Sequence, residues 1–164
     1  MAYSFLQDLK DIKELYSYGS KHYSALPNQA SEELKNNQAL LSIVVETVNQ
    51  KSATFNFLTR KMVPIMLCSA WDSFQKNLSQ DPQESHRHIT HFIDPYYKWH
   101  NQDIHEISLL RNCIVHNHGE IDQKYLDKST ILKFKILGEV VDFSELEISL
   151  QFRVFEDAYN KIMG

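Results

Sequence analysis

Apolar positions along most of the chain recur at intervals of three and four residues, the spacing of one face of an α-helix. Five such runs are present, beginning near Phe5, Leu34, Met62, Gln102 and Ile148. Pro27 and Ser31 precede the second run and favour a helix start there, and Pro64 is tolerated in the first turn of the third. The pattern therefore predicts a bundle of α-helices.

The period changes between residues 132 and 143. Leu132-Lys133-Phe134-Lys135-Ile136 alternates apolar and basic side chains, Gly138-Glu139 can turn, and Val140-Val141-Asp142-Phe143 is apolar again, which is typical of a short hairpin. Ser144 and Glu147 form a capping box in front of the last helix, whose aromatic stripe of Phe152, Phe155 and Tyr159 is expected in the core. We therefore predict an all-α fold, a helical bundle with a short β-hairpin before the C-terminal helix, in one domain spanning residues 1–164.

Composition and charge restrict the class of protein. With 43% hydrophobic and 23% charged residues the chain is ordinary for a globular protein, and no apolar stretch approaches a membrane span. A net charge of -4 argues against a surface that coats nucleic acid, although a local positive cleft is compatible with it because fields are screened over ~8 Å. Cys68 and Cys113 lie in apolar helix patterns and are expected to be reduced core thiols of a cytoplasmic protein.

The predicted helix over residues 102–118 carries an arginine on its apolar side. At ~100° per residue, Arg111 lies within the stripe formed by Ile104, Ile107, Leu110, Ile114 and Val115. Such a charge needs a carboxylate, carbonyl groups or a phosphate ligand nearby, because burying an unpaired charge is costly. The structural alternative is that Arg111 pairs with Asp72 or Glu106 to fix helix packing, although Glu106 by itself is expected to be a solvated helix charge.

A histidine follows at the end of the same helix. Asn112 and His116 are four positions apart and share a face, whereas Arg111 and His116 differ by ~140° around an ideal axis. Gly119 can adopt the left-handed conformation that ends helices, which places His116 in the last turn, where the helix dipole favours a protonated imidazole. Arginine binds phosphate and histidine exchanges protons near neutral pH, so the pair suits phosphodiester chemistry, unless His116 only caps the helix.

This motif resembles the HEPN superfamily, whose signature is an arginine, a polar residue and, a few positions later, a histidine (R-x4-6-H). Arg111, Asn112 and His116 fit it, and the surrounding sequence is similar to HEPN proteins of the abortive-infection and RNase-toxin type. The segment over residues 67–74 resembles the earlier core helix of the family, which often carries an acidic residue after an aromatic one, here Asp72. Some toxin members continue with His-x-Tyr, whereas this chain has His118 in the tyrosine's place, so regulation through that tyrosine is not implied.

The resemblance implies a metal-independent endoribonuclease without a cofactor, acting as a toxin or phage-defence effector. The RNA 2′-OH would attack the adjacent phosphate while His116 moves the proton, Arg111 stabilises charge on the phosphate oxygens and Asn112 positions phosphate or imidazole. Asp72 would orient Arg111. The resemblance also implies a homodimer in which two motif helices meet around one phosphate path, with an antitoxin or sensor protein as a candidate regulator.

Residues 81–100 have the least regular pattern and combine imidazoles, a guanidinium and flat aromatic rings. Within this region Arg87, Tyr97 and Trp99 are candidates, together with His118, for binding single-stranded RNA; the alternative is a partly buried surface loop. Three histidines could also approach one another around a metal ion: His86, His88 and His91. Their spacing matches no standard zinc pattern and no cysteine joins them, so we expect no metal.

Two other functions remain open at the level of sequence. A non-catalytic HEPN module would keep the motif for interface packing in a dimerising or RNA-binding scaffold. A nucleotide-binding protein is a third interpretation. Loss of RNA cleavage on replacement of Arg111 or His116, with the fold retained, would favour the enzyme over both.

Overall fold

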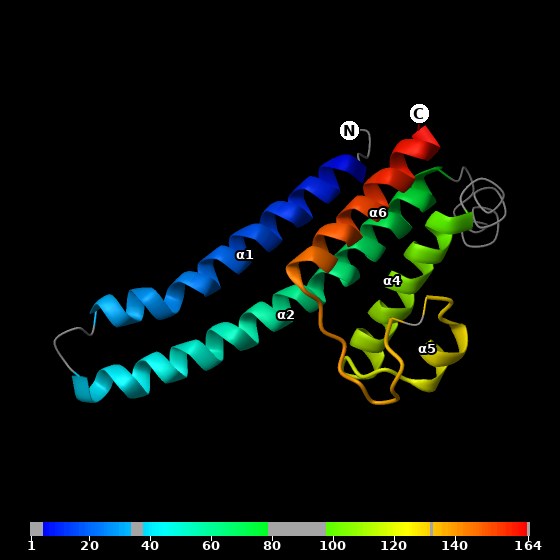
Figure 1. Ribbon diagram of the computed structural model, residues 1–164. Helices are drawn as coiled ribbons and strands as arrows, with labels where there is room; N and C mark the ends of the chain where they lie inside the picture. The colour runs from blue at the N-terminus through cyan, green and yellow to red at the C-terminus, as the bar shows by residue number, and fades with distance from the viewer. Residues whose placement is uncertain (1–4, 34–37, 79–97, 132, 164) are drawn as a thin grey trace.

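The computed structural model describes residues 5–33, 38–78, 98–131 and 133–163. Its described part contains five helices: α1 (Phe5–Glu33), α2 (Gln38–Leu78), α4 (Lys98–His116), α5 (Gln123–Lys128) and α6 (Glu145–Met163). Figure 1 shows α1 and α2 as a long antiparallel hairpin, with the other helices gathered around the half of α2 that ends at Leu78. The expectation of an all-α fold is therefore confirmed, and none of these helices is apolar over a length that would cross a membrane.

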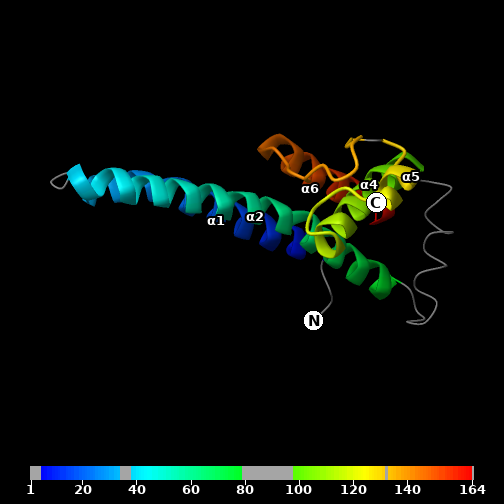
Figure 2. The same ribbon diagram turned by 90° about the horizontal axis from the view of Figure 1, so that it is seen from below.

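The far ends of α1 and α2 project from the bundle as an arm two helices thick (Figure 2). Within the arm, Tyr23 stacks on Phe55 with 4.6 Å between the ring centroids, and the Ser52 hydroxyl donates a hydrogen bond to the Tyr23 carbonyl. Larger apolar side chains on its surface, such as Leu58, are about half exposed. The arm is thus held by contacts between α1 and α2 themselves.

Two predicted helix starts are wrong, and both involve proline. α1 continues through Pro27 to Glu33, and α2 runs without a break through Pro64, so the second and third predicted helices lie largely within one helix of 41 residues. A proline inside a helix removes a backbone donor and crowds the preceding turn. Pro64 is less than 2% exposed, so its ring contributes to the core, and the gain from tertiary packing outweighs the local cost.

Aromatic side chains join α1, α2 and α6 at the bundle end of the molecule. The Phe5 ring lies 5.2 Å from that of Trp71, 5.1 Å from Phe74 and 5.4 Å from Tyr159, and Trp71 contacts Phe155 edge to face at 5.6 Å. Pairs of this kind contribute about 0.5–1.5 kcal/mol beyond their buried area. The aromatic stripe predicted for the last helix is therefore confirmed as part of the core.

Of the two features predicted before α6, the capping box and the β-hairpin, the structure shows only the capping box. The capping box forms, because the Ser144 hydroxyl donates to Glu147 Oε2 at 2.8 Å and accepts from the Glu147 amide at 3.3 Å. The predicted β-hairpin is not seen in the described residues from 133 to 143. There Val140 instead pairs with Glu120 in an isolated antiparallel bridge, and the Phe134 amide donates to the Tyr125 hydroxyl at 3.3 Å.

Candidate functional site

α4 carries the predicted motif and packs its apolar side into the core. Ile107, Leu110 and Cys113 are buried, whereas Val115, predicted in the same stripe, is 46% exposed. The helix ends at His116, two residues before the predicted end, and His116 lies in its last turn as predicted. The chain then turns through two residues with positive φ, His118 at 56° and Gly119 at 85°, and the Gly119 amide donates to the Cys113 carbonyl at 3.0 Å.

Arg111 is half-buried on this helix. Its Nη1 donates to Asn112 Oδ1 at 3.0 Å, and its buried Nε has no hydrogen-bond partner among the described residues. Throughout the described part of the chain, no carboxylate forms an ion pair with the guanidinium. Among the described residues, one amide oxygen therefore holds the Arg111 guanidinium in position and no carboxylate neutralises its charge.

The charges of Asp72 of α2 and Arg111 both act on the buried thiol of Cys68. Burial, with a further contribution from the Asp72 charge, raises the pKa of Cys68 to about 12, while Arg111 acts in the opposite direction. Cys68 and Cys113 are free and buried, in agreement with the prediction of core thiols. Asp72 thus lies in the neighbourhood of Arg111, but neither a hydrogen bond nor an ion pair joins these two described residues.

Glu106, the other carboxylate considered for Arg111, is engaged elsewhere. It is only 5% exposed and accepts hydrogen bonds from the Tyr125 hydroxyl and, at 2.5 Å, from the Ser129 hydroxyl. The expectation of a solvated charge is wrong for this residue, because it connects α4 to α5. Burial of the Tyr125 hydroxyl, followed by its hydrogen bond to Glu106, raises the pKa of Tyr125 to about 12.

The imidazoles at the end of α4 face solvent. His116 and His118 are both exposed, and among the described residues neither has a hydrogen bond to Arg111 or Asn112. Asn117, between them, donates to Asp122 Oδ2 at 2.6 Å, and Asp122 caps α5 through the Tyr125 amide. The loop that follows the motif is therefore fixed, although no hydrogen bond joins the described side chains of Arg111 and His116.

A second buried cation, Lys61 of α2, lies at the end of α4 and was not predicted. Lys61 is 8% exposed, its Nζ lies 4.1 Å from the centroid of the Phe57 ring, and a Cβ added at Gly119 would be 2.3 Å from that Nζ. Desolvation lowers the pKa of Lys61, and the Asp142 charge partly opposes this. A lysine one helical turn after a phenylalanine, inside an apolar run, is the sequence signal that could have identified it.

The remaining candidates cannot be placed with the motif. Arg87 and Tyr97 lie outside the described residues, as do the three histidines of the metal alternative, and the side chain of Trp99 at the start of α4 is not described. Within the residues that the structure does describe, no three histidine, cysteine or acidic side chains are grouped so as to hold a metal ion.

Comparison of the chain with models of known protein families, with curated proteins and with solved structures finds no match. At the motif, the described residues provide the guanidinium of Arg111 without a paired carboxylate, the Asn112 amide that binds it, and two exposed imidazoles at the end of α4.

Proposed function

We propose that the protein is a metal-independent endoribonuclease of the HEPN kind. Arg111 carries this proposal, because a half-buried guanidinium whose charge no described carboxylate neutralises is costly for the fold unless an anionic ligand occupies it. The two carboxylates that could have given Arg111 a purely structural role do not bind it. A phosphate group of RNA is the ligand that the resemblance of the motif implies.

In the proposed reaction the RNA 2′-oxygen forms a bond to the adjacent phosphorus and the bond to the 5′-oxygen breaks. His116 exchanges the proton, as the base for the 2′-OH or the acid for the leaving 5′-oxygen. Arg111 stabilises the charge that develops on the phosphate oxygens, and Asn112, which already accepts from Arg111, holds the guanidinium in orientation. No metal or cofactor takes part.

A homodimer would complete this site. Val115 and His116 are exposed at the end of α4, and among the described residues no hydrogen bond joins Arg111 to His116 of the same chain. A partner chain related by a two-fold axis could bring its His116 to the first chain's Arg111, so that two copies of each surround one phosphate path. By the same resemblance, the protein would act as a toxin or phage-defence effector under the control of an antitoxin or sensor protein.

The proposal is tested by cleavage of a defined single-stranded RNA by purified variants. Arg111→Ala and His116→Ala should each abolish cleavage with little change in helicity, whereas His105→Ala, which removes another exposed histidine of α4, should leave it unchanged. The wild-type protein should work in EDTA, leave 2′,3′-cyclic phosphate ends and spare DNA, which lacks the 2′-OH. Full cleavage by both motif variants would refute the assignment.

The non-catalytic scaffold is the second candidate, favoured by the absence of a hydrogen bond between the described side chains of Arg111 and His116. Mixing wild-type chains with doubly substituted Arg111→Ala, His116→Ala chains distinguishes the two. A shared site predicts that cleavage per wild-type chain falls as mixed dimers form, while a scaffold shows no cleavage by the wild-type chain at all. Constant cleavage despite mixed dimers would refute the shared site.

A further inference from the structure

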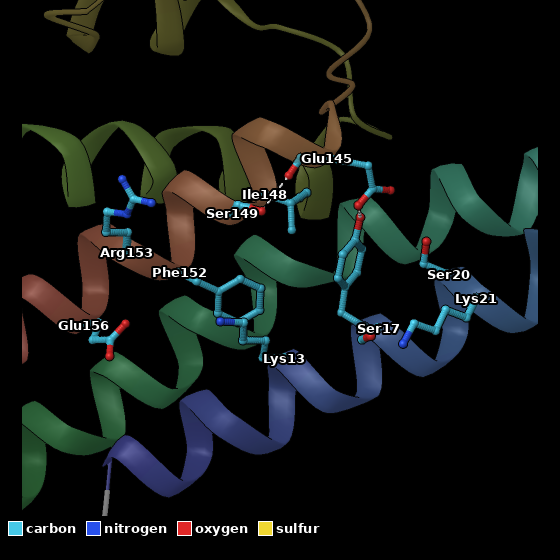
Figure 3. A pocket seen from close by; sticks show the side chains of 11 residues that line it. Lys13, Ser17, Ser20, Lys21, Glu145, Ile148, Ser149, Phe152, Arg153 and Glu156 are labelled. Atoms are coloured by element: carbon cyan, nitrogen blue, oxygen red, sulfur yellow. Dashed lines mark hydrogen bonds between the residues drawn. The ribbon is translucent and has the colours of Figure 1, made fainter.

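A polar pocket lies between α1 and α6, lined by no residue of the Arg111 motif (Figure 3). Its volume is about 500 Å³, within the range of small-molecule sites. Tyr16, Ile148 and Phe152 are buried and form its apolar wall, and the Tyr16 hydroxyl donates to Glu145 Oε2 at 2.5 Å. This hydrogen bond connects the two helices and fixes one end of the pocket.

Three cations line the pocket. Figure 3 shows Lys13 and Lys21 on α1 and Arg153 on α6, on opposite sides of the space. Within the described residues none of the three forms an ion pair. Three serine hydroxyls, those of Ser17, Ser20 and Ser149, lie among them. The pocket therefore gathers positive charge and hydroxyl groups in a chain whose net charge is -4.

The two acidic residues of the lining limit the shape of the ligand. Glu145 is the first lining residue of α6 and Glu156 the last, about three helical turns apart. A polyanion laid along α6 would meet a carboxylate at each end, which disfavours an RNA strand. A compact ligand with one anionic group would contact the cations between them.

We infer that this pocket binds a small organic molecule bearing a phosphate monoester. A phosphate monoester carries about -1.5 to -2 charges at pH 7 and offers three strong acceptor oxygens, which suits three cations and several hydroxyls better than a carboxylate does. The pocket is much larger than an inorganic phosphate ion, and its wall of Tyr16, Ile148 and Phe152 provides apolar surface for an organic body. Lys13, Lys21 and Arg153 would bind the phosphate, because charge-assisted hydrogen bonds are the strongest available to it.

The test is calorimetric titration of the full chain with 5′-AMP as the probe, with adenosine and inorganic phosphate as partial ligands. AMP should bind, adenosine should not, and inorganic phosphate should compete weakly. The double variant Lys13→Gln, Lys21→Gln should weaken AMP binding by about tenfold or more, and Arg153→Gln should weaken it independently from the side of α6. The matched control is Lys51→Gln, Lys124→Gln, which removes the same charge from two exposed lysines outside the pocket.

Equal weakening by the pocket variant and the control would show that only net charge matters and would overturn the inference. The absence of AMP binding at millimolar concentration would also overturn it. The same holds if AMP does not bind but a short RNA without a terminal phosphate does, and the pocket variant abolishes that RNA binding. Because Lys13 and Lys21 are exposed, the variants should fold, and an unchanged thermal transition checks this. None of these outcomes depends on whether Arg111 and His116 cleave RNA.

Discussion

Replacement of Arg111 by methionine should abolish RNA cleavage and leave the fold equally stable, or more stable by about 1 kcal/mol. Methionine keeps most of the length of the arginine stem and adapts to irregular surroundings. It removes the guanidinium, whose Nε is buried without a hydrogen-bond partner and whose charge is not paired with a described carboxylate.

The magnitude follows from two opposing contributions. Loss of the hydrogen bond from Arg111 Nη1 to Asn112 Oδ1 costs about 0.5–1.5 kcal/mol, whereas removal of a buried unsatisfied donor returns about 1–3 kcal/mol. Glu106 on the same helix provides the contrast, because its carboxylate has two hydroxyl donors. Glu106→Ala leaves the Tyr125 and Ser129 hydroxyls without this acceptor and should cost about 2–6 kcal/mol, or about 1–3 kcal/mol for each hydroxyl.

Urea unfolding followed by far-UV circular dichroism measures both free energies of unfolding. For a chain of this length 1 kcal/mol corresponds to about 2–4 °C in Tm, so the Glu106→Ala transition should fall well below that of Arg111→Met. A loss of more than about 1.5 kcal/mol in Arg111→Met, beyond the cost of its one hydrogen bond, would refute the reasoning. Arg111 would then be a structural residue with a partner that the proposed function does not need.

Three further predictions concern stability. The folded-state pKa of Tyr125 is raised from 10.0 to about 12, so Tyr125 loses its proton in the unfolded chain first as the pH rises. The free energy of unfolding should therefore fall between pH 10 and 12, and Tyr125→Phe should make that fall shallower in urea titrations across this window. Asp122→Ala removes the cap of α5 and should lower stability by about 1–2 kcal/mol, whereas the exposed Asp127→Ala should change it little in the same assay. Gly119→Ala should lower the Tm more than Gly138→Ala does in thermal unfolding. Both glycines have a positive φ, but only at Gly119 would the added methyl lie 2.3 Å from the amine of the buried Lys61. Equal losses of Tm would mean that backbone strain alone is responsible.

The features that could be predicted from sequence are those fixed by residues close together in the chain. The capping box before α6 joins residues three positions apart, and the end of α4 follows from a glycine three positions after His116. Local spacing also predicted the core faces of both helices, with Val115 as the exception. These contacts need no knowledge of which other element lies nearby.

The features that were missed depend on partners distant in sequence. Glu106 looked solvated because its two donors follow it by 19 and 23 residues. Lys133 belongs to the alternating pattern that suggested a hairpin, yet its amine pairs with Glu147 of α6 at 2.7 Å and lies over the Phe143 ring at 4.6 Å. Val140, from the second half of that pattern, pairs with Glu120. The pocket between α1 and α6 likewise forms from segments more than 120 residues apart.

The arm formed by the outer halves of α1 and α2 has a consequence for how the molecule opens. Helical pairs that touch only each other unfold locally at a free energy below that of the whole structure. Backbone amides around Ser52 and Tyr23 should therefore exchange with solvent deuterons through partial openings, while those around Leu67 and Leu110, buried in the bundle, should exchange only on global unfolding. The arm can thus fray and reform while α4, which carries Arg111, stays folded.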